Sequence, residues 1–261
     1  MNQPEGSVGV FDSGVGGISV LGELLRCLPN ERFIYYGDSA NAPYGSKTVD
    51  EVRELSLKIA DYLIIQRGVK ALVVACNTAT SAAVKLLRRE FSIPIIGMEP
   101  ALKPAVAMAR GGKVVVMATP MTIKEQKFQD LLFRYGKEAQ VFSLPCPGLV
   151  ELIEAGETEG ERINSYLKGL FGSFQLGEVD VVVLGCTHYV FIKESVAAFF
   201  QGRAAVIDGN RGTANQVIRV LEEKGLLSRG KNRPLAERVE LVTSGTAEDL
   251  ELWHRFLLKV S

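Results

Sequence analysis

An internal repeat constrains the fold of this 261-residue chain more than any other feature of its sequence. Four short segments recur in the same order, 106 to 111 residues further along: residues 9–13 match 115–119, 33–37 match 140–144, 71–78 match 181–188, and 94–100 match 205–211. Each match is weak alone, because Val-rich strands are common, so the shared order is the argument. It predicts two structurally related lobes.

Short apolar runs rich in Val and Ile alternate with segments of helical periodicity along the chain. Such runs are typical of strands buried on both faces, as in parallel sheets covered by helices. Thr48 and Glu51 form a capping-box pattern at the start of an amphipathic helix over 48–66. We therefore expect an α/β fold, with strands at 7–12, 32–38, 70–76, 93–98, 113–118, 140–145, 179–186, 204–208 and 239–243.

The repeat also predicts the domain organisation. The first α/β lobe is expected over residues 1–98 and the second over 99–208. Residues 209–261 follow the second copy and have no counterpart in it, so we expect them to return and pack on the first lobe. Each lobe should be a parallel-type sheet flanked by helices. Two such lobes facing each other would place one copy of each repeated motif on either side of a bound molecule.

Composition excludes several classes of function. The chain has 30 basic and 30 acidic side chains, a balance that argues against a nucleic-acid partner. Its apolar runs are shorter than the ~18 residues that a membrane span needs. The first basic residue after the initiator is Arg26, so the beginning lacks the charged start of a signal peptide. We expect a cytoplasmic protein with no membrane partner.

The four cysteines do not have the spacing of a metal site. Cys27, Cys76, Cys146 and Cys186 include no CxxC pair, and the sequence contains only two histidines. We therefore expect no metal, and a reducing compartment argues against disulfides. Cys27 lies in an amphipathic segment and is expected to be a buried apolar side chain. Cys146 lies in a predicted loop, has no repeat partner and is expected to be inert.

Three of the predicted strands end in polar or reactive residues, which are Asp12–Ser13, Cys76–Thr78 and Cys186–His188. In parallel α/β sheets, ligands bind beyond the carboxyl ends of the strands, and helix N-termini there attract anions. A dinucleotide site at 12–17 is disfavoured, because Ser19 stands where the third glycine of GxGxxG belongs. The pattern indicates a pocket for a carboxylate or phosphate group.

Cys76 and Cys186 correspond to each other under the repeat. Two opposed acid/base groups are what inversion at one carbon requires, since one removes a proton and the other delivers a proton to the opposite face. A thiol suits both roles, because its pKa of ~8.5 can be brought toward neutrality by its neighbours. Asp12 and His188 are the candidate neighbours.

Several sequence blocks resemble bacterial glutamate racemase: DSGVGG at 12–17, YGDSANAPYG at 36–45, ACNTAT at 75–80, GMEPALKPA at 97–105 and LGCTHY at 184–189. The resemblance spans nearly the whole chain and implies two α/β lobes with the active site between them. It implies a cofactor-independent isomerase that interconverts L- and D-glutamate and supplies D-glutamate for peptidoglycan in cell-wall synthesis. It also implies a homodimer, although the sequence does not indicate which surface pairs.

The resemblance further implies roles for individual residues. Cys76 and Cys186 would be the catalytic bases, with Asp12, His188 and Glu154 assisting. The implied substrate contacts are Asp12, Ser13, Tyr44, Gly45, Asn77, Thr78, Thr187 and His188, with Thr119 and Thr122 as further candidates in the second lobe.

Three other functions stay open from the sequence. Aspartate racemase shares the two-lobe, two-cysteine plan, and pocket length cannot be measured from spacing. A cysteine hydrolase could use Cys76 or Cys186 as nucleophile with His188 as base, but it leaves the other cysteine without a role. The third is a two-lobed, non-catalytic ligand-binding protein. Its usual periplasmic form carries a signal peptide, and the start of this sequence does not have the pattern of one.

Overall fold

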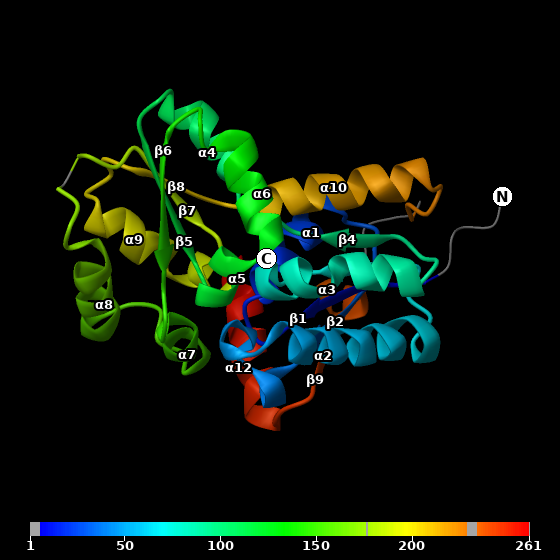
Figure 1. Cartoon of the computed structure of the whole chain (residues 1–261). Coiled ribbons are helices and arrows are strands. Elements are labelled where there is room, and N and C mark those ends of the chain that lie inside the picture. The colour runs from blue at the N-terminus through cyan, green and yellow to red at the C-terminus, as the bar shows by residue number, and fades with distance from the viewer. Residues whose placement is uncertain (1–5, 176, 229–233, 261) are drawn as a thin grey trace. The chain divides into compact units, whose positions relative to one another are not determined.

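The computed structural model describes residues 6–175, 177–228 and 234–260. The chain divides into two compact units, Met1–Met98 with Asn210–Ser261, and Glu99–Gly209 (Figure 1). Gly209, which we expected at the start of the returning segment, belongs to the second unit. Each unit is described by itself below. In the described part of the chain no helix is long and apolar enough to cross a membrane.

The first unit is built on a parallel sheet with the strand order β4-β3-β1-β2-β9. Its interior residues are almost entirely buried, as the Val- and Ile-rich runs predicted. The strands are β1 (Val8–Asp12), β2 (Phe33–Gly37), β3 (Ala71–Val74), β4 (Ile95–Gly97) and β9 (Val239–Thr243).

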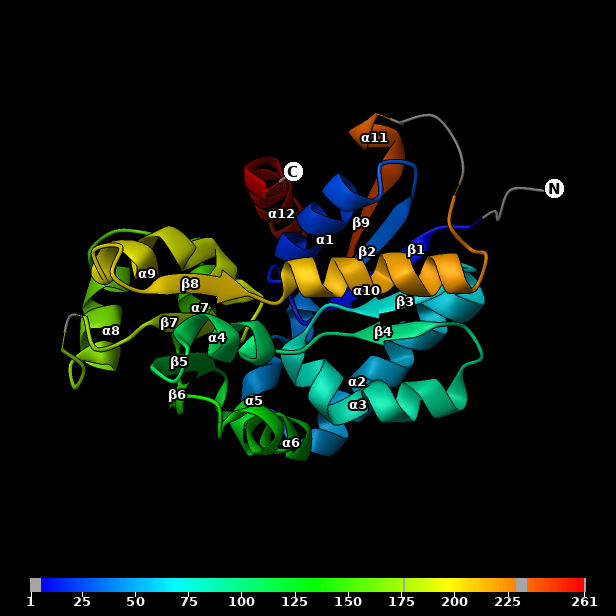
Figure 2. The ribbon, with the colours of Figure 1, turned by 90° about the horizontal axis from the view of Figure 1, so that it is seen from above.

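Helices cover both faces of this sheet. Figure 2 shows α1 and α12 on one side and α2 and α3 on the other, and α10 packs along α1. The capping box predicted at Thr48 and Glu51 is present at the start of α2. The helices of this unit are α1 (Ile18–Cys27), α2 (Val49–Asp61), α3 (Asn77–Glu90), α10 (Asn210–Glu223), α11 (Leu235–Arg238) and α12 (Ala247–Val260).

The second unit has a parallel sheet in the order β6-β5-β7-β8. Its strands are β5 (Lys113–Ala118), β6 (Gln140–Pro145), β7 (Val181–Leu184) and β8 (Ala205–Asp208). Within this unit, α4 and α6 lie on one side of the sheet and α8 and α9 on the other (Figure 1). Its helices are α4 (Leu102–Ala109), α5 (Pro120–Lys124), α6 (Gln126–Tyr135), α7 (Leu149–Glu154), α8 (Glu161–Phe171) and α9 (Lys193–Phe199).

The two sheets have the same internal order when they are aligned by the sequence repeat. Under the repeat β1, β2, β3 and β4 correspond to β5, β6, β7 and β8. The order β4-β3-β1-β2 then matches β8-β7-β5-β6, and β9 is the strand that the returning segment adds beside β2. The predicted α/β fold and the nine predicted strands are confirmed, with the ends of most strands trimmed by one or two residues.

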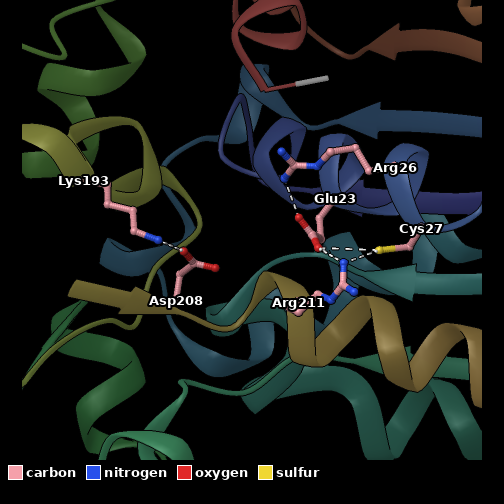
Figure 3. Close-up of polar contacts among 6 residues, drawn as sticks. All are labelled: Glu23, Arg26, Cys27, Lys193, Asp208 and Arg211. Atoms are coloured by element: carbon pink, nitrogen blue, oxygen red, sulfur yellow. Dashed lines mark hydrogen bonds and ion pairs between the residues drawn. The ribbon is translucent and has the colours of Figure 1, made fainter. Parts of the chain in front are cut away.

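The prediction that Cys27 is a buried apolar side chain is wrong. Cys27 is only partly buried, and its Sγ lies 3.5 Å from Oε1 of Glu23 and 3.1 Å from Nη1 of Arg211. Figure 3 shows Arg211 pointing from α10 toward this polar cluster on α1, which also includes Arg26. The helical period of α1 places Cys27 at the edge of the apolar face, where α10 supplies a cation. A separate ion pair in the same figure joins Lys193 to Asp208 in the second unit.

A buried ion pair of the first unit also binds Ser228 of the returning segment. Nζ of Lys70, just before β3, lies 2.7 Å from Oε2 of Glu31, and both side chains are at most 5% exposed. Ser228, which follows α10, donates to the same carboxylate from its backbone N–H at 2.6 Å and from its hydroxyl at 2.9 Å. Three donors therefore satisfy a carboxylate that burial would otherwise destabilise.

We predict that Lys70→Met lowers the free energy of unfolding by about 3–5 kcal/mol, because it leaves the Glu31 carboxylate buried without a cation. Denaturant unfolding followed by circular dichroism measures the change. The control is Glu223→Gln, which removes an exposed ion pair with Arg219 and should cost less than about 1 kcal/mol. Equal effects of the two substitutions would contradict the prediction.

Candidate active site

Parallel pairing brings the ends of β1 and β3 to one edge of the first sheet. Phe11 lies opposite Val74, and the backbone N–H of Ala75 donates to the Phe11 carbonyl at 2.8 Å. Asp12, the last residue of β1, and Cys76, two residues beyond the end of β3, therefore lie at the same edge of the sheet. Both side chains are buried.

Cys76 is the N-cap of α3. Its Sγ accepts a hydrogen bond from the backbone N–H of Ala79 at 3.4 Å, and the hydroxyl oxygen of Ser13 lies 3.9 Å away. The N-terminus of a helix carries partial positive charge, which favours the thiolate over the thiol. This position therefore suits a cysteine that must act as a base.

Asp12 is fully buried at the start of the DSGVGG turn. Its Oδ1 accepts a hydrogen bond from the backbone N–H of Gly14 at 2.9 Å. The turn thus holds the Asp12 carboxyl group beside Ser13, whose hydroxyl oxygen lies 3.9 Å from the Cys76 sulfur.

Asn77 and Thr78 open α3 directly after Cys76, and both are nearly fully buried. Among the described residues, the amide oxygen of Asn77 has no hydrogen-bond partner. An unsatisfied buried acceptor costs about 1–3 kcal/mol. A polar substrate group at this helix N-terminus would remove that cost.

Tyr44 is held by a network that sequence reasoning did not find. Its hydroxyl donates to Oδ2 of Asp38 at 2.6 Å, and the hydroxyl of Ser244 donates to Oδ1 of the same buried carboxylate at 2.6 Å. Burial raises the pKa of Tyr44, and the negative charges of Asp38, Cys76 and Asp12 raise it further. Tyr44 therefore stays neutral as a hydrogen-bond donor, and Gly45 follows it in the same short 3-10 helix, Tyr44–Ser46.

In the second unit, Cys186, His188 and Glu154 form a connected chain. Nδ1 of His188 lies 3.8 Å from Sγ of Cys186, and Nε2 of His188 lies 2.5 Å from Oε1 of Glu154. Cys186 and His188 follow β7, whereas Glu154 is the last residue of α7, 34 residues earlier. The fold thus brings the predicted assisting carboxylate to the predicted histidine.

The charge environment of His188 favours its protonated form. Burial lowers the pKa of His188, but the charge of Glu154 and the interactions with Glu154 and Cys186 together outweigh burial and raise this pKa well above its ordinary value. An imidazolium here lies between the Glu154 carboxylate and the Cys186 sulfur. It can stabilise a thiolate on Cys186 through its Nδ1–H group.

The remaining predicted residues of this unit lie at the same edge of its sheet. Thr187, which lies between Cys186 and His188 in the sequence, is buried. Thr119 follows β5, the neighbour of β7, and caps α5. Its Oγ1 accepts from the backbone N–H of Thr122 at 3.1 Å and lies 2.9 Å from the Thr122 hydroxyl.

Cys146 lies near this group but is poorly suited to act as a base. It is buried in the turn after β6, and burial, with the nearby Cys186, raises its pKa to about 12. The hydroxyl of Tyr189 donates to the Cys146 carbonyl at 3.3 Å. The thiol is thus neutral at physiological pH, as expected of an inert cysteine. In the residues that the structure describes, no group of His, Cys, Asp or Glu has the arrangement of a metal site.

The chain is similar in sequence to known proteins. The sequence profile of the Asp/Glu/Hydantoin racemase family matches residues 16–217. A glutamate racemase from Clostridium acetobutylicum is 48% identical over 259 residues, which cover 98% of this chain and 99% of the relative.

Solved structures show the same fold. Escherichia coli glutamate racemase in complex with L-glutamate and the activator UDP-MurNAc-ala matches with a TM-score of 0.86 and 29% identity, covering 99% of this chain and 96% of that one. Francisella tularensis glutamate racemase in complex with D-glutamate matches with a TM-score of 0.81 and 30% identity, covering 97% and 93%. The chain therefore belongs to the Asp/Glu/Hydantoin racemase family and is an isomerase.

Proposed function

We propose that this chain is a glutamate racemase in which Cys76 and Cys186 act as the two catalytic bases. One observation is the main support. At the corresponding strand ends of the two units, after β3 and after β7, there is a buried thiol beside a group that favours its anion. Inversion at a carbon requires such a pair, because the proton leaves one face and arrives at the other.

The substrate assignment is supported by the relatives. The Clostridium acetobutylicum relative is a glutamate racemase, and the Escherichia coli and Francisella tularensis structures contain L- and D-glutamate. The buried amide of Asn77, the hydroxyls of Ser13 and Thr187, and the N-terminus of α3 are suitable donors and acceptors for a charged amino acid.

In the proposed reaction, one thiolate removes the α-proton of glutamate and the other thiol donates a proton to the opposite face of the same carbon. With L-glutamate, the Cys186 thiolate removes the α-proton, and the Cys76 thiol donates its proton to the opposite face, which yields D-glutamate. The reverse reaction exchanges these roles. His188, held by Glu154, stabilises the Cys186 anion, while the N-terminus of α3 stabilises the Cys76 anion.

The chain Cys186–His188–Glu154 also resembles the nucleophile, base and carboxylate of a cysteine hydrolase. A hydrolase, however, gives no role to a second thiol capped onto a helix N-terminus. The family membership also favours racemisation over hydrolysis.

We further infer the cellular setting from this activity. D-Glutamate produced in the cytoplasm would be available for peptidoglycan synthesis, and a homodimer is the expected assembly. These inferences rest on the family resemblance and follow the proposed reaction.

The activity itself gives the first test. We predict that the purified protein racemises L- and D-glutamate without added pyridoxal phosphate, nucleotide or divalent metal, because thiols alone can move the proton. Circular dichroism of the substrate measures the reaction before and after dialysis against chelator. Activity on aspartate instead of glutamate would favour the aspartate racemase alternative, and loss of activity that added metal or cofactor restores would contradict the cofactor-free reaction.

The two thiols should be distinguishable by hydrogen exchange. We predict that Cys76→Ser and Cys186→Ser each lower net racemisation by roughly 10²–10⁴-fold, because a serine hydroxyl is too weakly acidic to replace a thiol. In D₂O, followed by ¹H NMR, Cys186→Ser should still exchange the α-hydrogen of D-glutamate, and Cys76→Ser that of L-glutamate. Cys146→Ser is the control and should remain active. Near-normal racemisation by either of the first two variants would contradict the two-base reaction.

The His188–Glu154 contact should determine the basic limb of the pH profile. Because the Glu154 charge raises the pKa of His188, Glu154→Gln should lower that pKa. The imidazolium would then be lost at a lower pH, so the basic limb of the kcat/KM profile should move toward lower pH. Glu151→Gln, on the exposed side of the same helix, is the matched control and should leave the profile in place. An unmoved basic limb in Glu154→Gln would contradict this role of the contact.

A further inference from the structure

The turn that carries Asp12 is anchored to the sheet through Gly14. On one side of this glycine, its backbone N–H donates to Oδ1 of Asp12 at 2.9 Å. On the other side, its carbonyl accepts a hydrogen bond from the hydroxyl of Tyr35 at 2.5 Å. Tyr35 lies in β2 and is fully buried. The Tyr35 side chain from the neighbouring strand therefore binds the same peptide segment that is bonded to the Asp12 carboxylate.

Close packing fixes the ring of Tyr35 in this position. Trp253 of α12 meets it edge to face, with the ring centroids 5.4 Å apart and the planes at 88°. A Cβ atom at Gly37 would lie 2.2 Å from the Trp253 ring and 2.9 Å from the Gly14 carbonyl oxygen. A Cβ atom at Gly17 would lie 2.6 Å from Cβ of Asp12 and 2.9 Å from the Tyr35 hydroxyl. Only glycine at these two positions allows the turn, the tyrosine and the tryptophan to approach so closely.

From this geometry we propose that Tyr35 is a positioning residue, which acts through the Gly14 backbone to hold Asp12 and Ser13 for proton transfer at Cys76. The inference rests on the proposed two-base reaction. The Ser13 hydroxyl lies 3.9 Å from the Cys76 sulfur, so a shift of the turn changes the surroundings of that thiol. Cys186 follows a strand of the other unit and has a partner of its own, His188, whereas Tyr35 contacts the turn beside Cys76.

The test uses the single-thiol backgrounds, because steady-state kinetics cannot separate the two half-reactions. L- and D-glutamate have equal free energies in solution, so kcat/KM is the same in both directions for every variant. Exchange of the α-hydrogen in D₂O reports one thiol at a time. Tyr35→Phe keeps the ring and removes only the hydroxyl, and Tyr36→Phe is the matched control on the same strand, since the Tyr36 ring instead packs on Tyr62.

In the Cys186→Ser background, we expect Tyr35→Phe to slow exchange of D-glutamate by about tenfold, the effect of losing one buried hydrogen bond. In the Cys76→Ser background, exchange of L-glutamate should change less than threefold. Tyr36→Phe should leave both rates unchanged. Thermal unfolding of each variant shows whether the protein stays folded at the assay temperature.

Unchanged exchange of D-glutamate in Tyr35→Phe would overturn the inference. An equal fall of both exchange rates would also overturn it, because that result indicates a general structural role. If Cys186→Ser with Tyr35 intact exchanges neither enantiomer, the proposed two-base function fails first, and the inference fails with it.

Discussion

Parallel strand pairing determines where the reactive groups of this protein lie. In the first unit, the pairing of Phe11 with Val74 brings Asp12 and Cys76 to the same edge of the sheet. In the second, the pairing of Met117 with Leu184 does the same for Thr119 and Cys186. A slip of one residue in either pair would turn each side chain to the other face of its sheet. The buried Val and Ile side chains of these strands make such a slip costly, so core packing and site geometry have one cause.

The two thiols correspond under the repeat, yet different groups favour their anions. Cys76 caps a helix of 14 residues and accepts a backbone hydrogen bond. Cys186 is followed by a 3-10 helix, His188–Ile192, whose first residue supplies an imidazole in place of backbone donors. Helix N-termini do not titrate, whereas an imidazole does. The pKa of His188 therefore depends on the Glu154 carboxylate, whereas the positive end of α3 beside Cys76 keeps its charge at every pH.

The sequence predicted the strands, the repeat and the local strand-end motifs because these depend on neighbouring residues. The residues that sequence reasoning placed less well depend on contacts between distant segments. Glu154 was found only through a family resemblance, since 34 residues separate it from His188. The network of Asp38, Tyr44 and Ser244 spans 206 residues, and no local pattern marks it. Cys27 was predicted as buried because its helix is amphipathic, but Arg211 from α10 makes its surroundings polar.

The returning segment has a role that the repeat could not predict. It adds β9 to the edge of the first sheet, places Ser244 on the Asp38 carboxylate and packs Trp253 against Tyr35. The second unit has no such addition, and β6, the counterpart of β2, is an edge strand of the described sheet with partly exposed side chains. The first unit therefore has an extra layer behind its strand ends. Trp253 and Ser244 thus constrain both the turn of Asp12 and the loop of Tyr44 in the first unit, and the repeat alone does not predict this constraint.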